Sequence, residues 1–341
     1  MGVLGVLTAG GDCPGLNAVI RGVVGRATER GTDVVGILDG WEGLLHDRTI
    51  PLDRNAVRGV LGRGGTFLGT SRLDPYVHAE GLVSCSPTIE RNGIDRLVII
   101  GGDGTLRAAM RLSDEGMPVV GVPKTIDNDI EGTDITFGFS TAVQIATDAI
   151  DRLATTAEAH NRVIVVEVMG RTKGWIATHA GIAGGADYIL IPEVEYDIDE
   201  VAETLRSRHR SGRRYSIVVV AEGIDPPSGQ KEVATKKDAF GFDRLGGVGY
   251  RVASAIEERT GFETRVSVLG HIQRGGTPVA ADRVLATRLG VAAADLAVDG
   301  ETSVMTSVRG PRIEPIPLSV ATAGIRGVPA DLYETAATFF G

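Results

Sequence analysis

The sequence predicts an α/β fold made of two wound α/β lobes with largely parallel sheets. Short apolar runs alternate with helical patterns along most of the chain, which is typical of wound sheets. The chain has 341 residues, more than one hydrophobic core usually serves, so two lobes are expected. Polar, glycine-containing motifs follow nearly all expected strands, and ligands bind at that edge of open α/β sheets. We therefore expect the ligand site in the cleft between the lobes.

The first lobe is expected to begin with alternating strands and helices. Its first helix is predicted to start at about Pro14, because proline suits a first helical turn. The expected strands span residues 3–7, 34–38, 96–100 and 119–122, and the first helix spans residues 14–29.

A long helix over residues 140–160 is expected to open the second lobe, with the boundary near Gly138. Strands are then expected over residues 163–168, 216–221 and 264–269, followed by a return to the first lobe and a helix over 279–299. The predicted lobes are residues 1–138 plus 273–322, and residues 139–272 plus 323–341. Residues 225–243 are rich in Lys, Asp, Pro and Gly, which predicts a mobile surface loop.

Charge and composition narrow the class of protein. The net charge of −9 argues against broad binding to nucleic acids or anionic membranes, which need a basic surface. No apolar stretch approaches the roughly 20 residues needed to cross a bilayer. The chain start reads as a strand and not as a signal peptide, and the two cysteines are most simply free thiols. A soluble cytoplasmic protein is expected.

The first motif is the glycine-rich turn at residues 10–15 (GGDCPG), which follows a strand and precedes a helix. Backbone N–H groups at such a turn can approach phosphate oxygens, and the helix dipole favours an anion. The alternative is a tight turn with no ligand. The motif matches neither the dinucleotide-binding nor the P-loop pattern.

Two further motifs carry carboxylates. Asp103 lies in GGDGT and is predicted to hold Mg²⁺ beside a polyphosphate, with a helix N-cap as the alternative. Asp127 and Asp129 lie in TIDND and point the same way if that segment is extended, so that one serves a metal while the other accepts a proton. The alternative for this pair is an Asp/Asn turn.

Five arginines are candidate ligands of phosphate, because the guanidinium fork matches phosphate oxygens. Arg72, Arg171 and Arg274 lie in glycine-containing loops, and Arg274 follows His271 in GHIQRGG. Arg162 and Arg265 lie at strand starts, the wrong end of the sheet for their own cleft. If these two bind substrate, they are expected to reach a neighbouring subunit's site. The alternatives are solvated surface arginines and, for His271, a capped turn.

The combination of motifs resembles the 6-phosphofructokinases. The segments LTAGGDCPGLNAVIRGVV, IGGDGTL, PKTIDND, MGRTKGWIA, AEG and GHIQRGGTP occur in that family's order, from about Val3 to the helix after Pro278. The resemblance is to the bacterial, ATP-dependent type that carries the Gly104 and Lys124 pair. It implies Mg-dependent transfer of the ATP γ-phosphoryl group to the 1-hydroxyl of fructose 6-phosphate in glycolysis.

The resemblance also implies a role for each matching residue. Asp127 matches the general base, and Asp103 matches the Mg²⁺ ligand. The implied catalytic residues are Thr125, Asp127, Asp129, Arg171 and Arg72. The implied nucleotide site, on the first lobe, comprises Gly11, Arg72, Leu73, Gly102, Asp103, Gly104 and Thr105. The implied sugar-phosphate site comprises Thr125, Ile126, Asp127, Arg162, Met169, Gly170, Arg171, Glu222, Arg265, His271, Ile272, Gln273 and Arg274, with Arg162 and Arg265 supplied across an interface of a homo-oligomer, typically a tetramer.

The phosphoryl donor follows from two positions. Gly104 favours ATP, because a carboxylate there would crowd and repel the α-phosphate. The resemblance implies that Lys124 favours pyrophosphate, because many ATP-dependent members of the family carry Gly at this position and pyrophosphate-dependent members carry Lys; pyrophosphate remains the alternative. Gly104 outweighs Lys124, since steric exclusion filters more strongly than one added cation. A NAD or lipid kinase, which shares only GGDGT, and a non-catalytic regulatory subunit are more distant alternatives. Arg21 and Arg54 match the family's effector pocket, whereas Gly25 does not.

Overall fold

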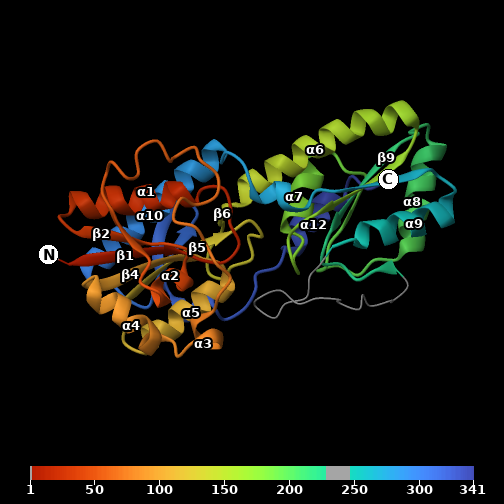
Figure 1. The fold of residues 1–341 in the computed structure, drawn as a ribbon. Helices are drawn as coiled ribbons and strands as arrows, with labels where there is room; N and C mark the ends of the chain where they lie inside the picture. Colours follow the sequence, from red (N-terminus) through yellow and green to blue (C-terminus); the bar gives the residue numbers. More distant parts are fainter. Residues whose placement is uncertain (1, 228–245) are drawn as a thin grey trace. The chain divides into compact units, whose positions relative to one another are not determined.

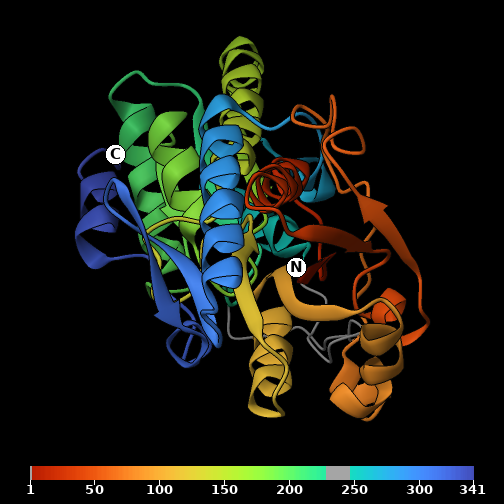
Figure 2. The ribbon, with the colours of Figure 1, turned by 90° about the vertical axis from the view of Figure 1, so that its left-hand side faces the viewer.

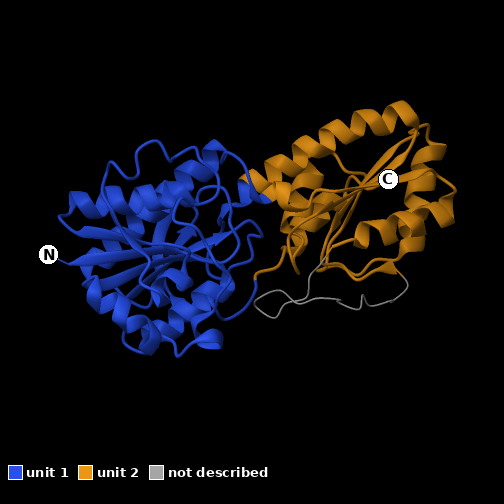
Figure 3. Ribbon diagram, viewed as in Figure 1, with its two compact units in different colours: residues 1–140, 239–241, 274–325 blue, residues 141–238, 242–273, 326–341 orange. Residues whose placement is uncertain are grey.

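The computed structural model describes residues 2–227 and 246–341. These residues form two compact units, coloured separately in Figure 3. Unit 1 contains the described residues 2–140 and 274–325, and unit 2 contains 141–227, 246–273 and 326–341. The α/β class with two largely parallel sheets is confirmed. The loop predicted over 225–243 falls mostly outside the described residues.

Unit 1 is built on one large sheet with the strand order β12-β11-β5-β4-β1-β2-β3, with β6 paired to β5. The strands are β1 Val3–Thr8, β2 Asp33–Ile37, β3 Thr49–Leu52, β4 Ile94–Gly101, β5 Val119–Thr125, β6 Phe137–Gly138, β11 Val304–Arg309 and β12 Arg312–Pro317. Only the β2–β3 and β11–β12 pairs are antiparallel. The four strands expected from the sequence are confirmed, whereas β3, β6, β11 and β12 were not anticipated.

Helices cover both faces of this sheet (Figure 1). They are α1 Leu16–Glu29, α2 Trp41–Leu45, α3 Pro75–His78, α4 Leu82–Arg91, α5 Asp103–Asp114, α10 Ala280–Asp299 and α11 Leu318–Ala321. Helices α1 and α10 lie on one face, and α4 and α5 lie on the other (Figure 1). Buried side chains of β4, α4 and α5, such as Ile99, Ile89 and Leu106, share one apolar cluster. This packing anchors β4 and α5, which flank the Asp103 segment, in the core of unit 1.

Helices α1 and α10 lie side by side (Figure 2), and glycines allow their backbones to make close contact. A Cβ on Gly22 of α1 would lie 2.7 Å from the carbonyl oxygen of Thr287, and one on Gly290 of α10 would lie 2.3 Å from that of Val19. Helix α1 begins at Leu16 and not at Pro14, so that expectation was wrong by two residues. Gly15 precedes the helix with φ 106°, a left-handed conformation that interrupts the helical backbone.

Unit 2 contains a four-stranded parallel sheet with the order β10-β7-β9-β8. Its strands are β7 Val163–Val168, β8 Tyr188–Leu190, β9 Ser216–Ala221 and β10 Thr264–Val268. Its helices are α6 Phe139–His160, which starts at the end of unit 1, α7 Trp175–Ala183, α8 Ile198–Arg210, α9 Val248–Thr260 and α12 Ala330–Ala337. The three expected strands and the long helix are confirmed, and β8 was missed.

Two further expectations concern thiols and membranes. Cys13 and Cys85 are both buried free thiols, as predicted. Across residues 2–227 and 246–341, every helix is too short or too polar to cross a bilayer.

Candidate active site

Three neighbouring strands of unit 1 end in the three motifs found in the sequence. Strand β4 pairs in parallel with both β1 and β5, so the carboxyl ends of all three strands meet at one edge. The glycine-rich turn follows β1, the Asp103 segment follows β4, and TIDND follows β5. A Cβ on Gly10 would lie 3.3 Å from Thr105 Oγ1 and 3.5 Å from Lys124 Nζ. The structure therefore brings these three motifs together.

Two hydrogen bonds, one from a backbone N–H and one from a side-chain hydroxyl, attach the segment before Arg72 to the glycine-rich turn. Gly10 has φ 83°, its N–H donates to the Ser71 carbonyl at 2.9 Å, and its carbonyl accepts from Thr70 Oγ1 at 2.7 Å. Arg72 follows directly and is exposed, while Leu73 packs against the apolar core. Arg72 is thus held at the same edge of the sheet as Gly11.

Arg274 lies in unit 1 and contacts the glycine-rich turn. Its Nη1 donates to the Asp12 carbonyl at 3.4 Å, and a Cβ on Gly11 would lie only 2.9 Å from that nitrogen. The absence of a side chain at Gly11 therefore makes room for the guanidinium. The sequence grouped Arg274 with His271 in one motif, but Arg274 belongs to unit 1 and His271 to unit 2.

Lys124 is a buried cation in this cluster. The residue belongs to strand β5, its side chain is buried, and its Nζ donates a hydrogen bond to the Gly11 carbonyl. Burial lowers the pKa of Lys124 to about 8, because removing an ammonium group from water disfavours its charged form. Lys124 therefore joins the glycine-rich turn to the end of β5.

Asp103 is the first residue of α5, and Gly102 is the N-cap. The alternative that Asp103 caps this helix is therefore wrong. Its carboxylate is 8% exposed and accepts a hydrogen bond from Arg107 Nε at 2.9 Å. The helix dipole favours an anion at this position. Gly104 and Thr105 follow in the first turn of the same helix.

The chemistry of Asp103 fits Mg²⁺ bound together with a polyphosphate. Within the described ranges, no three His, Cys, Asp or Glu side chains gather into a metal cage. Mg²⁺ usually takes one or two protein carboxylates and completes its octahedron with phosphate and water oxygens. A single buried carboxylate beside glycine-rich loops matches that mode of binding.

Asp127 is a buried carboxylate, and one of its oxygens accepts no hydrogen bond from the described residues. Its residue is 4% exposed, its N–H donates to Thr125 Oγ1 at 3.0 Å, and Oδ2 accepts from that hydroxyl at 3.3 Å. Oδ1 is buried and has no hydrogen-bond partner among the described residues. A buried oxygen without a donor is suited to accepting a proton from a ligand hydroxyl.

The TIDND segment is not extended, although the prediction that Asp127 and Asp129 point the same way required an extended segment. Asn128 has φ 53°, and its Oδ1 accepts from the Thr136 N–H at 2.9 Å. The chain therefore turns between Asp127 and Asp129 and is fixed by the segment before β6. Ile126 and Asp129 are both buried. The Asp/Asn turn and a carboxylate site thus occur together and are not alternatives.

Unit 2 collects a second group of predicted residues at the carboxyl ends of β7 and β9. Arg171, with φ 54°, donates its N–H to Glu222 Oε1 at 3.0 Å. The Met169 N–H donates to Gln273 Oε1 at 3.4 Å, and Gln273 Nε2 donates to the Gly270 carbonyl at 3.0 Å. Buried Gln273 therefore ties the GHIQR segment, which forms the short helix η2 (Gly270–Arg274), to the end of β7.

The remaining predicted residues of unit 2 differ in exposure. Gly170 is buried between Met169 and Arg171, with φ 143°. His271 and Ile272 are exposed on η2. Unit 2 thus combines a fixed pair of strand ends with an exposed segment.

Arg162 and Arg265 lie at the opposite edge of the unit 2 sheet. Arg162 directly precedes β7, and Arg265 is the second residue of β10, as expected. Both pair with Glu263: Arg162 Nη2 lies 2.8 Å from Glu263 Oε1, and Arg265 Nη2 also bonds that oxygen. Since the strands are parallel, these guanidinium groups are separated from Met169 and Glu222 by the length of the sheet.

Sequence reasoning missed three carboxylates and cations that matter to these sites. Arg107 was overlooked because a single arginine on an exposed helix face gives no pattern of its own. Its spacing of four residues from Asp103 is nevertheless a signal for an ion pair. Glu263 neighbours Arg265 in the sequence and gave no separate pattern. Buried Glu167 accepts hydrogen bonds from the N–H groups of Gly247 and Gly249, where it stabilises the start of α9.

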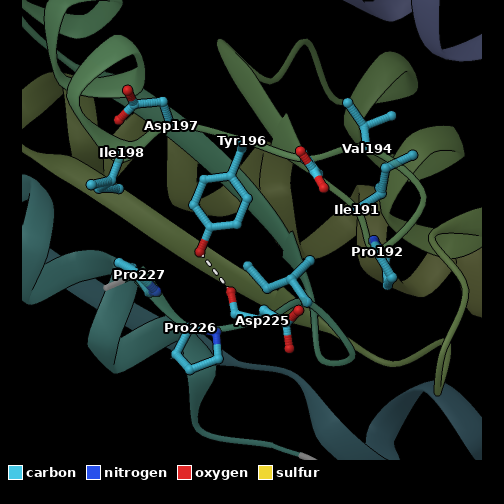
Figure 4. A pocket seen from close by; sticks show the side chains of 11 residues that line it. Ile191, Pro192, Val194, Tyr196, Asp197, Ile198, Asp225, Pro226 and Pro227 are labelled. Carbon is cyan, nitrogen blue, oxygen red and sulfur yellow. Dashed lines mark hydrogen bonds between the residues drawn. The ribbon is translucent and has the colours of Figure 1, made fainter. Parts of the chain in front are cut away.

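Unit 2 also contains a cavity of about 380 Å³ between β8, α8 and the end of β9 (Figure 4). Tyr196 reaches across it and donates its hydroxyl to the Asp225 carbonyl at 2.7 Å. The lining residues are Ile191, Pro192, Val194, Glu195, Tyr196, Asp197, Ile198, Ile224, Asp225, Pro226 and Pro227. None of them is a predicted site residue.

Comparisons with known proteins agree on one family. The phosphofructokinase family model matches residues 3–297. The chain is 52% identical to the ATP-dependent 6-phosphofructokinase of Corynebacterium efficiens and 53% identical to the pyrophosphate–fructose 6-phosphate 1-phosphotransferase of Streptomyces coelicolor, each alignment covering 99% of both chains. The crystal structure of Pichia pastoris phosphofructokinase in the T-state superposes with a TM-score of 0.83 and 32% identity, over 99% of this chain and 36% of that longer chain.

Proposed function

Because the chain belongs to the phosphofructokinase family, we propose that it transfers a phosphoryl group to the 1-hydroxyl of fructose 6-phosphate. The observation that carries this proposal is the buried Oδ1 of Asp127, which has no hydrogen-bond partner in the described part of the chain and lies at the sheet edge that also holds Asp103. Such an arrangement offers a base for the acceptor hydroxyl and an anionic ligand for the donor's cation. The family match leaves the NAD-kinase and lipid-kinase alternatives without support.

Asp127 acts as the general base in this proposal. It takes the proton of the sugar 1-hydroxyl as that oxygen forms a bond to the terminal phosphorus of the donor, and the bond from phosphorus to the leaving phosphate oxygen breaks. Thr125 holds Asp127 through two hydrogen bonds, so the carboxylate is oriented before the sugar arrives. Asp129, buried two residues further on, supports the negative potential of this segment.

Asp103 is the residue that would hold Mg²⁺, with the donor's phosphate oxygens. When bound, the ion neutralises charge on the transferred group and its leaving group. Gly11, Gly102, Gly104, Thr105, Arg72 and Leu73 form the donor side of the site. Arg274, fixed on the Asp12 carbonyl, places a further positive charge at this edge.

The sugar phosphate is assigned to the residues that unit 2 collects. Arg171 and Glu222 are tied to each other, and Met169, Gly170, His271 and Ile272 lie on segments joined by Gln273. Arg162 and Arg265 are assigned to the same ligand from an adjacent subunit of a homo-oligomer. Unit 1 is then the nucleotide-binding lobe, and unit 2 is the sugar-phosphate-binding lobe.

We propose ATP as the phosphoryl donor. Gly104 carries no side chain in the first turn of α5, so no carboxylate at this position crowds or repels an α-phosphate. Lys124, the residue that favours pyrophosphate, is buried and already donates to the Gly11 carbonyl. An ammonium group engaged with the main chain is a weaker addition to a pyrophosphate site than a free one.

Pyrophosphate is the second candidate donor, because Lys124 lies at the same sheet edge as the three motifs and the 53% identical relative from Streptomyces coelicolor carries that activity in its name. A turnover assay with fructose 6-phosphate and Mg²⁺ should compare the two donors directly. We expect fructose 1,6-bisphosphate to form with ATP and little to form with pyrophosphate. The reverse preference would overturn the assignment of the donor, and no product with either would overturn the function.

The variant Gly104→Asp tests the steric argument behind this assignment. We expect kcat/KM for ATP to fall by at least about 100-fold, since an added carboxylate both fills space and repels a phosphate. Gly25→Asp is the matched control, because Gly25 lies within helix α1, is partly exposed, and its Cβ would meet no neighbour within 4 Å. Full ATP activity in Gly104→Asp would show that the argument is wrong.

A further inference from the structure

One face of α5 carries Asp103 and two arginines. Asp103, Arg107 and Arg111 are spaced four residues apart, so they follow each other along that face. The Arg111 guanidinium lies 3.8 Å from the centre of the Tyr76 ring and is engaged there. Arg107 instead donates from Nε to Asp103 Oδ1 at 2.9 Å. Arg107 is therefore the cation that the fold gives to the proposed metal ligand.

The pair differs from an ordinary ion pair on a helix surface. Arg206 and Glu203 on α8 have the same 2.9 Å separation, but the Glu203 side chain is 55% exposed, against 8% for Asp103. An exposed pair contributes little because water competes for both charges. The Asp103 carboxylate is largely withdrawn from water, and its guanidinium partner is half-exposed. Asp103 thus depends on a cation, while Arg107 can move away from it into solvent.

We propose that Arg107 is a donor-site residue that competes with the divalent cation for Asp103 and so sets the metal dependence of donor binding. This inference rests on the proposed function. A carboxylate oxygen that accepts from a guanidinium group cannot also ligate a cation at full strength. Without metal, Arg107 balances the charge of Asp103 and lets a polyphosphate approach. When metal is bound, Arg107 releases Asp103 to the cation. The Arg107 guanidinium then remains one helical turn from Asp103, where it is able to pair with phosphate oxygens.

The class of ligand follows from the charges. The Asp103 and Arg107 pair is neutral as a whole, and adding a divalent cation makes it strongly positive. A polyanion, such as the phosphate chain of a nucleoside triphosphate, matches that state. Arg107 therefore acts on the phosphate chain and its cation, whichever acceptor the enzyme uses.

Calorimetric titration of the full chain with the non-hydrolysable analogue β,γ-imido-ATP tests this role, in Mg²⁺ and again in EDTA. For Arg107→Gln, we expect the ratio of Kd in EDTA to Kd in Mg²⁺ to rise about tenfold over wild type. In EDTA the metal-free analogue meets an uncompensated Asp103, whereas in Mg²⁺ the loss of a phosphate contact is offset because Asp103 no longer has to leave a guanidinium group to ligate the cation. Arg107→Lys keeps the charge, and its ratio should stay within about threefold of wild type. Arg206→Gln removes the exposed pair of α8 and should leave the ratio unchanged.

The outcomes separate the two proposals. If wild type binds neither β,γ-imido-ATP nor imidodiphosphate in Mg²⁺, the proposed function fails, and this inference fails with it. If wild type binds but Arg107→Gln keeps the wild-type ratio, the function stands and the role of Arg107 is wrong. An equal rise in Arg107→Lys and Arg107→Gln would also overturn it, since charge would then not be the cause. Thermal melting of each variant verifies that it is folded.

Discussion

The two units place their charged ligand residues in opposite ways. In unit 1, the carboxylates Asp103, Asp127 and Asp129 are all buried at one sheet edge, at the ends of neighbouring strands. In unit 2, Arg171 lies at the carboxyl edge, whereas Arg162 and Arg265 lie at the amino edge and pair with Glu263. Buried carboxylates need a fold that fixes them, whereas partly exposed arginines are able to change partners. Unit 1 therefore gathers its carboxylates at one end of its strands, whereas unit 2 has candidate arginines at both ends of its strands.

The largest effect is expected from Asp127→Asn, which keeps the shape of the buried side chain and removes the base. We expect kcat to fall by about 10³-fold, within the range that general base catalysis contributes. The KM for fructose 6-phosphate should change far less, because the hydrogen bond from Thr125 is retained. Steady-state kinetics provide the measurement.

Asp114→Asn, at the exposed end of α5, is the control for Asp127→Asn. If kcat of Asp127→Asn falls by less than tenfold, Asp127 is not the general base, and the proposed difference between the two units is wrong.

The second prediction concerns the burial of Lys124. Because its pKa is about 8 in the folded protein and about 10.5 in the unfolded chain, the unfolded state binds more protons between these values. The free energy of unfolding of wild type, relative to Lys124→Met, should therefore rise with pH through this window, by up to about 3 kcal/mol, and stay flat below pH 8. Urea denaturation at pH 7 to 10.5 measures this difference.

Lys173→Met, which removes a partly exposed lysine of unit 2, provides the comparison between the units. A wild-type minus Lys124→Met difference that does not vary with pH would show that unit 1 keeps this lysine hydrated.

The third prediction tests whether unit 2 needs a second copy of the chain. We expect Arg162→Ala to raise the KM for fructose 6-phosphate by about tenfold, through the loss of a charge-assisted contact. At a fructose 6-phosphate concentration well below the wild-type KM, Arg162→Ala alone should show about one tenth of wild-type activity. Subunits of Arg162→Ala refolded together with an equal amount of Asp127→Asn should then regain up to about one quarter of wild-type activity, if each site combines Asp127 of one subunit with Arg162 of another.

Each variant refolded by itself is the control for that mixture. A mixture no more active than the average of the two variants would place Arg162 in the site of its own chain.

The sequence located most strands and the polar motifs that follow them, because an apolar run and a glycine-rich turn are local signals. It missed β12, where Pro315 and Pro317 argue against a strand. The structure tolerates both prolines because β12 is an edge strand paired on one side to β11. It also placed the start of α1 at Pro14, since the left-handed conformation of Gly15 depends on the surrounding packing.

By itself, the sequence determined which residue types stand at the ends of the strands and therefore which chemistry is available. Tertiary structure decided how that chemistry is arranged: it buried Lys124 against the Gly11 carbonyl, left Asp127 Oδ1 without a hydrogen-bond partner within residues 2–227 and 246–341, paired Arg107 with Asp103, and turned Arg274 toward Asp12. The reason is physical. Periodicity and turn chemistry act over a few residues, whereas burial and the pairing of charges depend on segments that are distant in the chain and adjacent only after folding.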